Sequence, residues 1–305
     1  MNDIDKAIEI LKDTSGGVVG MPTETVYGLA GSINSEKSIR KIFSVKERPF
    51  FDPLIVHVSN IEMAKPLTSN WSDITDKLAK AFWPGPLTIV LPKSNLVSDL
   101  ITSGLDSVGI RCPKHETALR LIEKLGHGLA APSANKFTKT SPTRKAHVES
   151  EFGDEVFVID GGECEIGIES TVIGVFDTQI KIYRPGMLTK EDIQKVVPKN
   201  IEVDYYESPV SPGQLKHHYM PNKPVTLRVS KSDKTGVSTW TVPNSPTLAA
   251  RELYSKLREF DLEDTNEIHI VLKEEFKNCD LWKGILNRLD KAKTTDLYFK
   301  SGLSE

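Results

Sequence analysis

The amino-acid sequence predicts an α/β fold in two parts. Over the first two-thirds of the chain, short apolar runs of strand length alternate with segments of helical period, which is typical of a sheet that carries helices. The same alternation resumes after residue 224, in a segment of about 80 residues that is near the lower limit for an independent core. A length of 305 residues also favours about two domains.

The first part contains apolar runs that we expect to be strands: 17–21, 54–58, 87–91, 107–111, 128–131, 156–159, 171–175 and 181–183. Amphipathic segments are expected to be helices: 4–13, 35–44, 73–82, 116–125, 143–150 and 190–196. A further helix is expected to begin near Thr23 and Thr25, with its free N–H groups directed at the space above the preceding strand.

The composition changes near Val197. Residues 198–224 contain five prolines and little helical period, which is typical of a linker. The expected division is a first domain over 1–197, a linker over 198–224 and a small α/β domain over 225–305. In the small domain we expect strands at 225–229 and 267–272 and helices at 247–260 and 281–292.

Bulk properties argue against several classes of protein. A net charge of −3 is unlike that of a general nucleic-acid coat, which is strongly basic. The apolar runs fall well short of the roughly 20 residues that cross a membrane, and the first residues lack a signal-peptide pattern. The three cysteines are scattered, which fits a reducing compartment. We therefore expect a cytoplasmic protein without membrane attachment.

The most informative segment is PTETVYGL at 22–29, followed by Lys46 and Arg48. It combines hydroxyls and cations in one strand–turn–helix unit, which suits the binding of a small anion. Thr25, Lys46 and Arg48 could grip a carboxylate or a phosphate, although a helix cap beside a solvated basic face explains them equally well. The sequence lacks the motifs GxxxxGK[ST], GxGxxG, HExxH and GxSxG, so the usual nucleotide and hydrolase scaffolds have no support.

Arg111 and three histidines are further candidates. Arg111 ends an expected strand just before a proline, where it could hold a carboxylate or form a surface ion pair. His57 lies within an apolar run and is more often explained as a core residue than as a ligand. His217 and His218 have no third ligand at a familiar spacing, so no metal centre is expected.

Two loop regions combine small and polar residues. Ser133 and Asn135, and Ser141 after them, could contact a base or a phosphate, or simply precede a helix cap. Ser170 and Arg184 belong to two glycine-containing segments that could approach a ligand closely, and a hairpin would explain the glycines as well.

Taken together, these segments resemble the YrdC-type threonylcarbamoyl-AMP synthase family in its longer, two-domain form. The matching motifs are PTETVYGL at 22–29, KxR at 46–48, PLIVH at 53–57, WPGPLT at 83–88, APSAN at 131–135, IESTV at 168–172 and RPG at 184–186. The linker segment SPGQLKHHYMP at 211–221 also resembles that of the long form. The resemblance covers the first 221 residues almost continuously.

The resemblance implies a twisted mixed sheet with helices and a concave ligand surface, and a small Rossmann-like domain that is shortened, with its middle strands missing. It implies an enzyme that condenses L-threonine, bicarbonate and ATP to threonylcarbamoyl-AMP and pyrophosphate. Mg²⁺ is expected with ATP. Other proteins would transfer the threonylcarbamoyl group to an adenosine beside the anticodon of certain tRNAs, so no stable nucleic-acid binding is expected.

The resemblance also assigns roles by position. Threonine would be held by Thr25, His57, Arg111 and Ser170. ATP would be held by Lys46, Arg48, Ser107, Ser133, Asn135, Ser141 and Arg184, with the linker residues Pro212, Gly213, His218 and Tyr219 closing over it as a lid. Lys46, Arg48 and Arg111 would be the catalytic cations, which neutralise charge and align the reactants.

One departure from the family pattern bears on the phosphates. Asp52 stands where the family often has Asn, and a carboxylate there would repel ATP unless Mg²⁺ bridges them, so Asp52 is left out of the expected site. Two other hypotheses stay open: an RNA-binding module that uses the same basic concavity without catalysis, and an ATP-dependent carbamoyl transferase that acts on another substrate.

Overall fold

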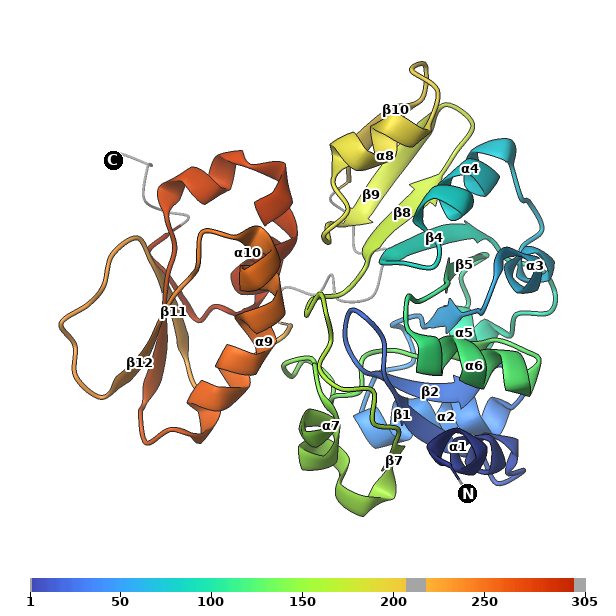
Figure 1. Ribbon diagram of the computed structural model, residues 1–305, viewed down its shortest axis with the longest axis horizontal. Coiled ribbons are helices and arrows are strands. Elements are labelled where there is room, and N and C mark those ends of the chain that lie inside the picture. The colour runs from blue at the N-terminus through green and yellow to red at the C-terminus, as the bar shows by residue number, and fades with distance from the viewer. Residues whose placement is uncertain (1, 207–217, 299–305) are drawn as a thin grey trace.

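The computed structural model describes residues 2–206 and 218–298, which form a larger and a smaller α/β unit that lie side by side (Figure 1). In these residues, ten strands form one mixed sheet in the order β10-β9-β8-β4-β5-β3-β6-β2-β1-β7. Four further strands form a parallel sheet in the order β12-β13-β11-β14. The α/β class predicted from the sequence is confirmed for both parts.

The strands of the large sheet are β1 (Val18–Met21), β2 (Gly28–Ser32), β3 (Ile55–His57), β4 (Leu87–Pro92), β5 (Ser107–Arg111), β6 (Leu129–Ala130), β7 (Phe157–Val158), β8 (Thr171–Val175), β9 (Gln179–Arg184) and β10 (Glu202–Tyr205). The helices of this unit are α1 (Asp3–Lys12), α2 (Glu36–Lys46), α3 (Ile61–Ala64), α4 (Asp73–Phe82), α5 (Asp99–Thr102), α6 (Glu116–Leu125), α7 (Lys145–Phe152) and α8 (Lys190–Val196). Each strand and helix expected in residues 4–196 is present within a few residues, apart from the helix near Thr23.

The helix expected to begin near Thr23 and Thr25 is wrong. The Thr23 hydroxyl accepts hydrogen bonds from the backbone N–H groups of Thr25 and Val26, at 3.2 and 3.3 Å, and donates to the carbonyl of Val26 at 2.6 Å. These local bonds form a tight turn in place of a helical one. The chain then returns as β2, which pairs antiparallel with β1.

Strand β2 was not expected, because its sequence Gly-Leu-Ala-Gly-Ser has low strand propensity. It is buried throughout and lies between β1 and β6, so pairing and packing outweigh local preference. Strand β10 also extends the large sheet beyond the boundary expected at Val197. It pairs in parallel with β9, from Glu202 opposite Gln179 to Tyr205 opposite Ile182.

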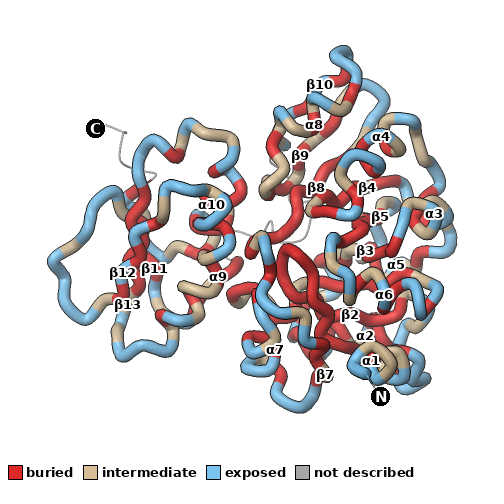
Figure 2. Tube along the Cα trace, viewed as in Figure 1, coloured by how far each residue is buried: buried red, intermediate tan, exposed pale blue. Residues whose placement is uncertain are grey.

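Helices cover both faces of the large sheet, and the buried residues lie between the layers (Figure 2). Helices α1 and α6 pack together through residues such as Leu11 and Leu121, over the face that carries Val19 and Met21. The main core is on the other face, where Ile42 of α2 and Leu78 of α4 are fully buried. This packing holds the strand ends rigidly in place for a site at one edge.

The smaller unit consists of β11 (Val225–Arg228), β12 (Val237–Thr241), α9 (Pro246–Leu262), β13 (Glu267–Val271), α10 (Lys283–Ala292) and β14 (Thr295–Asp296). The expectation that its middle strands are missing is wrong for 237–241, which alternates buried and less buried residues as β12. Its apolar core also includes Val26, Ile168 and Tyr219, so the core is continuous across the two units. No helix in the described part of the chain is long and apolar enough to span a membrane.

Candidate functional site

A pocket opens beside the ends of β3, β5 and β9, on the side of the larger unit that faces the smaller one. Strands β3 and β5 run parallel and bring His57 opposite Arg111, while Arg184 ends β9 next to the start of β8. The predicted site residues that line the pocket are Arg48, His57, Arg111, Ser133, Ser170, Arg184, His218 and Tyr219. Segments more than 160 residues apart in the sequence therefore meet at one site.

Arg111 is a buried cation with a buried partner. Its Nη2 atom lies 2.7 Å from Oε2 of Glu24, and its Nε donates to the carbonyl of Gly85 at 3.3 Å. Glu24 belongs to the PTETVYGL segment but was not predicted as a site residue. A charged side chain between two threonines in a buried turn was the signal that could have found it, because a buried carboxylate needs a cationic partner.

His57 is a neutral polar group beside Arg111. Burial lowers the pKa of His57 to about 3, and the charge of Arg111 adds to this effect. Thr25, which was predicted beside it, is fully buried and does not line the pocket directly. The Thr25 hydroxyl lies 2.9 Å from that of Thr23, within the turn that carries Glu24.

Ser170 and Arg184 are joined by direct hydrogen bonds. Arg184 donates from Nη2 to the Ser170 hydroxyl and from Nε to the Ser170 carbonyl, each at 3.1 Å. The Ser170 hydroxyl also lies 2.8 Å from that of Thr88 on β4. The residue predicted for threonine and the cation predicted for ATP therefore share one network, which places two sets of candidate ligand groups side by side.

Arg48 and Asp52 form a buried ion pair. Nη2 of Arg48 lies 2.8 Å from Oδ2 of Asp52, and the same guanidinium donates to the carbonyls of Asp52 and Pro53. Burial raises the pKa of Asp52, against the opposing charges of Arg48 and Lys46. The residue left out of the predicted site is thus the direct partner of a residue included in it.

Lys46 holds the loop around Ser133 by hydrogen bonds to its backbone. Its ammonium donates to the carbonyls of Ser133, at 2.5 Å, and of Asn135. Burial lowers the pKa of Lys46 well below its ordinary value, and Arg48 adds to this effect. Asn135 donates in turn to the carbonyls of Lys136 and Lys139. Lys46 and Asn135 therefore shape the loop and do not line the pocket.

Glu169 is the second site residue that was not predicted. It lines the pocket and accepts hydrogen bonds from Ser141, at 2.6 Å, and from Tyr254 of the smaller unit. It also forms an ion pair with Arg288 at 3.0 Å. Burial alone would raise the pKa of Glu169, but Arg288, Arg184 and the Ser141 hydroxyl lower it to about 2. The carboxylate is therefore ionised at neutral pH.

One predicted residue, Ser107, lies away from the pocket, and two others belong to a segment that the structure does not describe. Ser107 begins β5 and Arg111 ends it, so they are about 13 Å apart along the strand and Ser107 is not at the pocket. Pro212 and Gly213 lie outside the described residues. His218 and Tyr219 are buried against the pocket, and Thr140 donates to the carbonyl of Tyr219 at 3.3 Å.

Two family models match the chain, one after the other along the sequence. A model of the Sua5, YciO and YrdC proteins, described as "Telomere recombination", matches residues 12–186. A second model, described as "Threonylcarbamoyl-AMP synthase, C-terminal domain", matches residues 188–294.

Whole proteins are similar over nearly the full chain. A threonylcarbamoyl-AMP synthase of Pyrococcus abyssi is 36% identical over 91% of this chain and 90% of its own length. One from Bacillus subtilis is 36% identical over 95% of this chain and 92% of its own. The crystal structure of P. abyssi Sua5 complexed with L-threonine matches with a TM-score of 0.86 and 33% identity, over 96% of both chains.

Proposed function

The chain belongs to the Sua5/YrdC family of threonylcarbamoyl-AMP synthases in its long, two-domain form, and we propose that it condenses L-threonine, bicarbonate and ATP into threonylcarbamoyl-AMP and pyrophosphate. It is an enzyme, a transferase that uses ATP. The observation that carries the proposal is the meeting of Arg111, His57 and Ser170 with Arg48 and Arg184 in one buried pocket.

Threonine is assigned to the part of the pocket around Arg111. Arg111 contacts Glu24 and the carbonyl of Gly85 through Nη2 and Nε. Because a guanidinium has five N–H donors, donors remain for a substrate carboxylate. Neutral His57 and the Ser170 hydroxyl can meet the polar groups of the amino acid. Thr25 would contribute through the turn that holds Glu24.

ATP is assigned to the part around Arg48 and Arg184, with Ser133 and Tyr219 in the same wall. Lys46, Asn135 and Ser141 would act by holding the loop 133–141 and Glu169 in place. The linker residues Pro212, Gly213, His218 and Tyr219 remain our proposed lid. Ser107 is left out of the proposed set because of its place at the far end of β5.

The chemistry needs alignment and charge neutralisation more than a protein nucleophile. The threonine amine and bicarbonate give a carbamate and water, and the carbamate oxygen then attacks the α-phosphorus of ATP as pyrophosphate leaves. Negative charge accumulates on the phosphate oxygens, where Arg48 and Arg184 would stabilise it. A neutral His57 adds no competing cation near Arg111 and can accept or donate one hydrogen bond.

Mg²⁺ would enter with ATP and neutralise part of the phosphate charge. Two carboxylates lie beside the residues assigned to ATP, Asp52 and Glu169, and each is already paired with an arginine. This donor set suits an ion held by the phosphates and water more than one held by a protein cage. No protein ligand is therefore assigned to the ion.

We also propose a division of the chain into a catalytic domain that ends after β10, a linker, and a small domain from Val225. Bicarbonate as third substrate and a downstream tRNA threonylcarbamoyl transferase as recipient of the product follow from the proposed reaction. A cytoplasmic place of action fits a product that serves tRNA modification.

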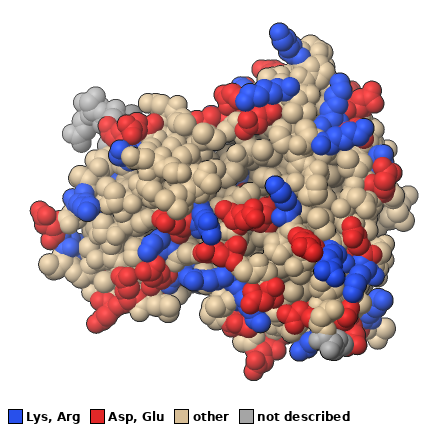
Figure 3. All heavy atoms as spheres, in the orientation of Figure 1, with Lys and Arg blue, Asp and Glu red and all other residues tan. Residues whose placement is uncertain are grey.

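One assay tests the function. The purified chain is incubated with ATP and Mg²⁺, with threonine or bicarbonate omitted in turn, while pyrophosphate and the AMP adduct are measured. We expect release that needs both co-substrates. Release without threonine would overturn the proposal and favour a carbamoyl transferase for another substrate. Salt-sensitive RNA binding without turnover would favour the RNA-binding alternative, which the intermixed acidic and basic side chains on the face in Figure 3 do not support.

A further inference from the structure

Two helices of the smaller unit reach residues at the pocket. Tyr254 and Arg258 on α9 and Arg288 on α10 are buried or nearly so, and each forms hydrogen bonds with the larger unit. On α9, residues 254, 258 and 261 follow the spacing i, i+4, i+7 and therefore share one face of the helix. That face is turned toward the loop 133–141 and Glu169.

Arg288 and Tyr254 converge on Glu169. Arg288 donates to both the carboxylate and the backbone carbonyl of Glu169, at 3.0 and 3.2 Å, and to the carbonyl of Pro185. Tyr254 donates to the carboxylate at 2.9 Å. The opposite oxygen of the carboxylate accepts the Ser141 hydroxyl at 2.6 Å. The Tyr254 hydroxyl also lies 3.2 Å from this oxygen. Glu169 therefore connects Ser141 to the smaller unit.

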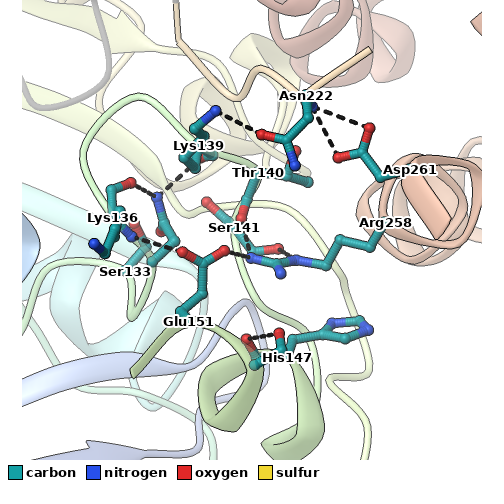
Figure 4. Close-up of polar contacts among 12 residues, drawn as sticks. Ser133, Lys136, Lys139, Thr140, Ser141, His147, Glu151, Asn222, Arg258 and Asp261 are labelled. Carbon is teal, nitrogen blue, oxygen red and sulfur yellow. Dashed lines mark hydrogen bonds and ion pairs between the residues drawn. The ribbon is translucent and has the colours of Figure 1, made fainter. Parts of the chain in front are cut away.

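Arg258 binds the backbone of the loop 133–141, to which Ser141 belongs. It donates to the carbonyls of Thr140 and Ser141 and to the carboxylate of Glu151, as Figure 4 shows. Glu151 in turn accepts the backbone N–H of Lys136 at 3.3 Å. In the same view, Asp261 accepts the backbone N–H of Asn222, whose side chain accepts from Lys139. The loop is thus connected to α9 at Lys136 and over residues 139–141.

Tyr219 completes the contact between the units. Its ring lies 5.7 Å from that of Tyr254 and 5.7 Å from the guanidinium carbon of Arg288. These residues belong to, or border, the apolar core that the smaller unit shares with Val26 and Ile168. A shared core of this kind makes the two units move together more than a polar interface would.

We propose that Tyr254, Arg258 and Arg288 are positioning residues for the nucleotide half of the pocket, so that the smaller domain governs ATP binding and leaves threonine binding largely unaffected. Their partners, Thr140, Ser141 and Glu169, lie on the side that we assign to ATP. The described contacts of Arg111 are instead with Glu24 and Gly85 of the larger unit. This inference rests on the proposed function for the identity of its ligands.

The test compares two conservative variants with a matched control in the full-length chain. Tyr254→Phe keeps the ring and removes one hydrogen bond to Glu169, and Arg288→Lys keeps the charge and removes the planar fork. The control is Arg251→Met, on the same helix, which removes an exposed pair with Glu163 at 3.5 Å across the same interface. Dissociation constants are measured for a non-hydrolysable ATP analogue and for L-threonine, together with the midpoint of thermal unfolding.

Because hydrogen bonds to a charged group contribute more than neutral ones, we expect each of the two variants to weaken binding of the ATP analogue about tenfold. Threonine binding should change less than about twofold, and Arg251→Met should change neither. Equal weakening of both ligands, an unchanged ATP constant, or the same loss in Arg251→Met would overturn the inference. A failure of the proposed function would give a different result, because the wild-type chain would then bind the analogue without releasing pyrophosphate in a threonine-dependent manner.

Discussion

The guanidinium of Arg111 and the carboxylate of Glu24 lie 2.7 Å apart, with both side chains almost wholly buried at the pocket. An ion pair in such surroundings is costly to break, because either partner alone would be a buried charge without compensation. Glu24 therefore fixes where Arg111 points and offsets its charge. The remaining donors of Arg111 are directed by this contact, which explains why a glutamate belongs in the turn that precedes β2.

Arg111→Ala should weaken threonine binding far more than ATP binding. It removes the cation that we assign to the substrate carboxylate, and charge-assisted contacts of this kind account for about tenfold or more in affinity. Calorimetric titrations with L-threonine and with a non-hydrolysable ATP analogue measure the two effects separately. Equal losses for both ligands would contradict the assignment.

A second variant separates the loss of threonine binding from a loss of stability, because Arg111→Ala leaves Glu24 as a buried charge without a partner. The double variant Glu24→Gln with Arg111→Ala removes both charges and should recover part of the free energy of unfolding lost in the single variant. The double variant should still bind threonine weakly and the ATP analogue well. Urea unfolding of the three proteins checks the stability part.

Lys46→Met should weaken ATP binding through the loop that it supports. The change removes the ammonium that donates to the carbonyls of Ser133 and Asn135, so we expect a loss of about 2 kcal/mol in stability and a clear rise in KM for ATP. The KM for threonine should stay nearly constant. Lys136→Met, on the same loop but in an exposed pair with Glu47, is the control and should change none of these values. A similar rise in both KM values would mean that Lys46 supports the whole pocket.

Apolar runs with clear boundaries are what the sequence predicts well, and β5 and α6 agree with the predicted ranges because periodicity and buried packing favour the same structure there. β2 was missed because its small residues gain their stability from neighbouring strands. Ser107 was assigned by its position in the family pattern, and a match along the sequence does not tell which end of a strand meets a ligand. The pair Glu169 and Arg288 is 119 residues apart in the sequence, and no local pattern predicts such a contact.

Protonation of buried histidine should make stability fall below about pH 6.5. Burial keeps the pKa of His57 at about 3 in the folded protein, while in the unfolded chain it has its ordinary value of 6.5. Between these values the unfolded state binds a proton that the folded state does not, so the free energy of unfolding decreases as pH falls. For one such histidine the loss between roughly pH 7.5 and 5.5 is about 1.4 kcal/mol.

His57→Gln should therefore make the unfolding free energy less dependent on pH by about that amount, as measured by urea unfolding at both pH values. His147 and His218, whose pKa values burial also lowers to about 3, should keep part of the dependence. A variant with the same pH profile as the wild type would show that His57 is already protonated, or exposed, in the folded protein.

Asp52→Asn should strengthen the binding of ATP when Mg²⁺ is absent. Asp52 is an anion 2.8 Å from Arg48. Its charge competes with the phosphates for Arg48 and also repels a triphosphate. The asparagine keeps a similar shape, and Arg48 retains its bonds to the carbonyls of residues 52 and 53. The buried guanidinium loses its counter-charge, so the free energy of unfolding should also fall. We expect about tenfold tighter binding of a non-hydrolysable ATP analogue in the presence of a chelator, with a smaller change when Mg²⁺ screens the phosphates. Calorimetry under both conditions measures the difference. If binding instead weakens only when Mg²⁺ is present, Asp52 is a ligand of the metal ion, and the view that phosphates and water alone hold the ion is wrong.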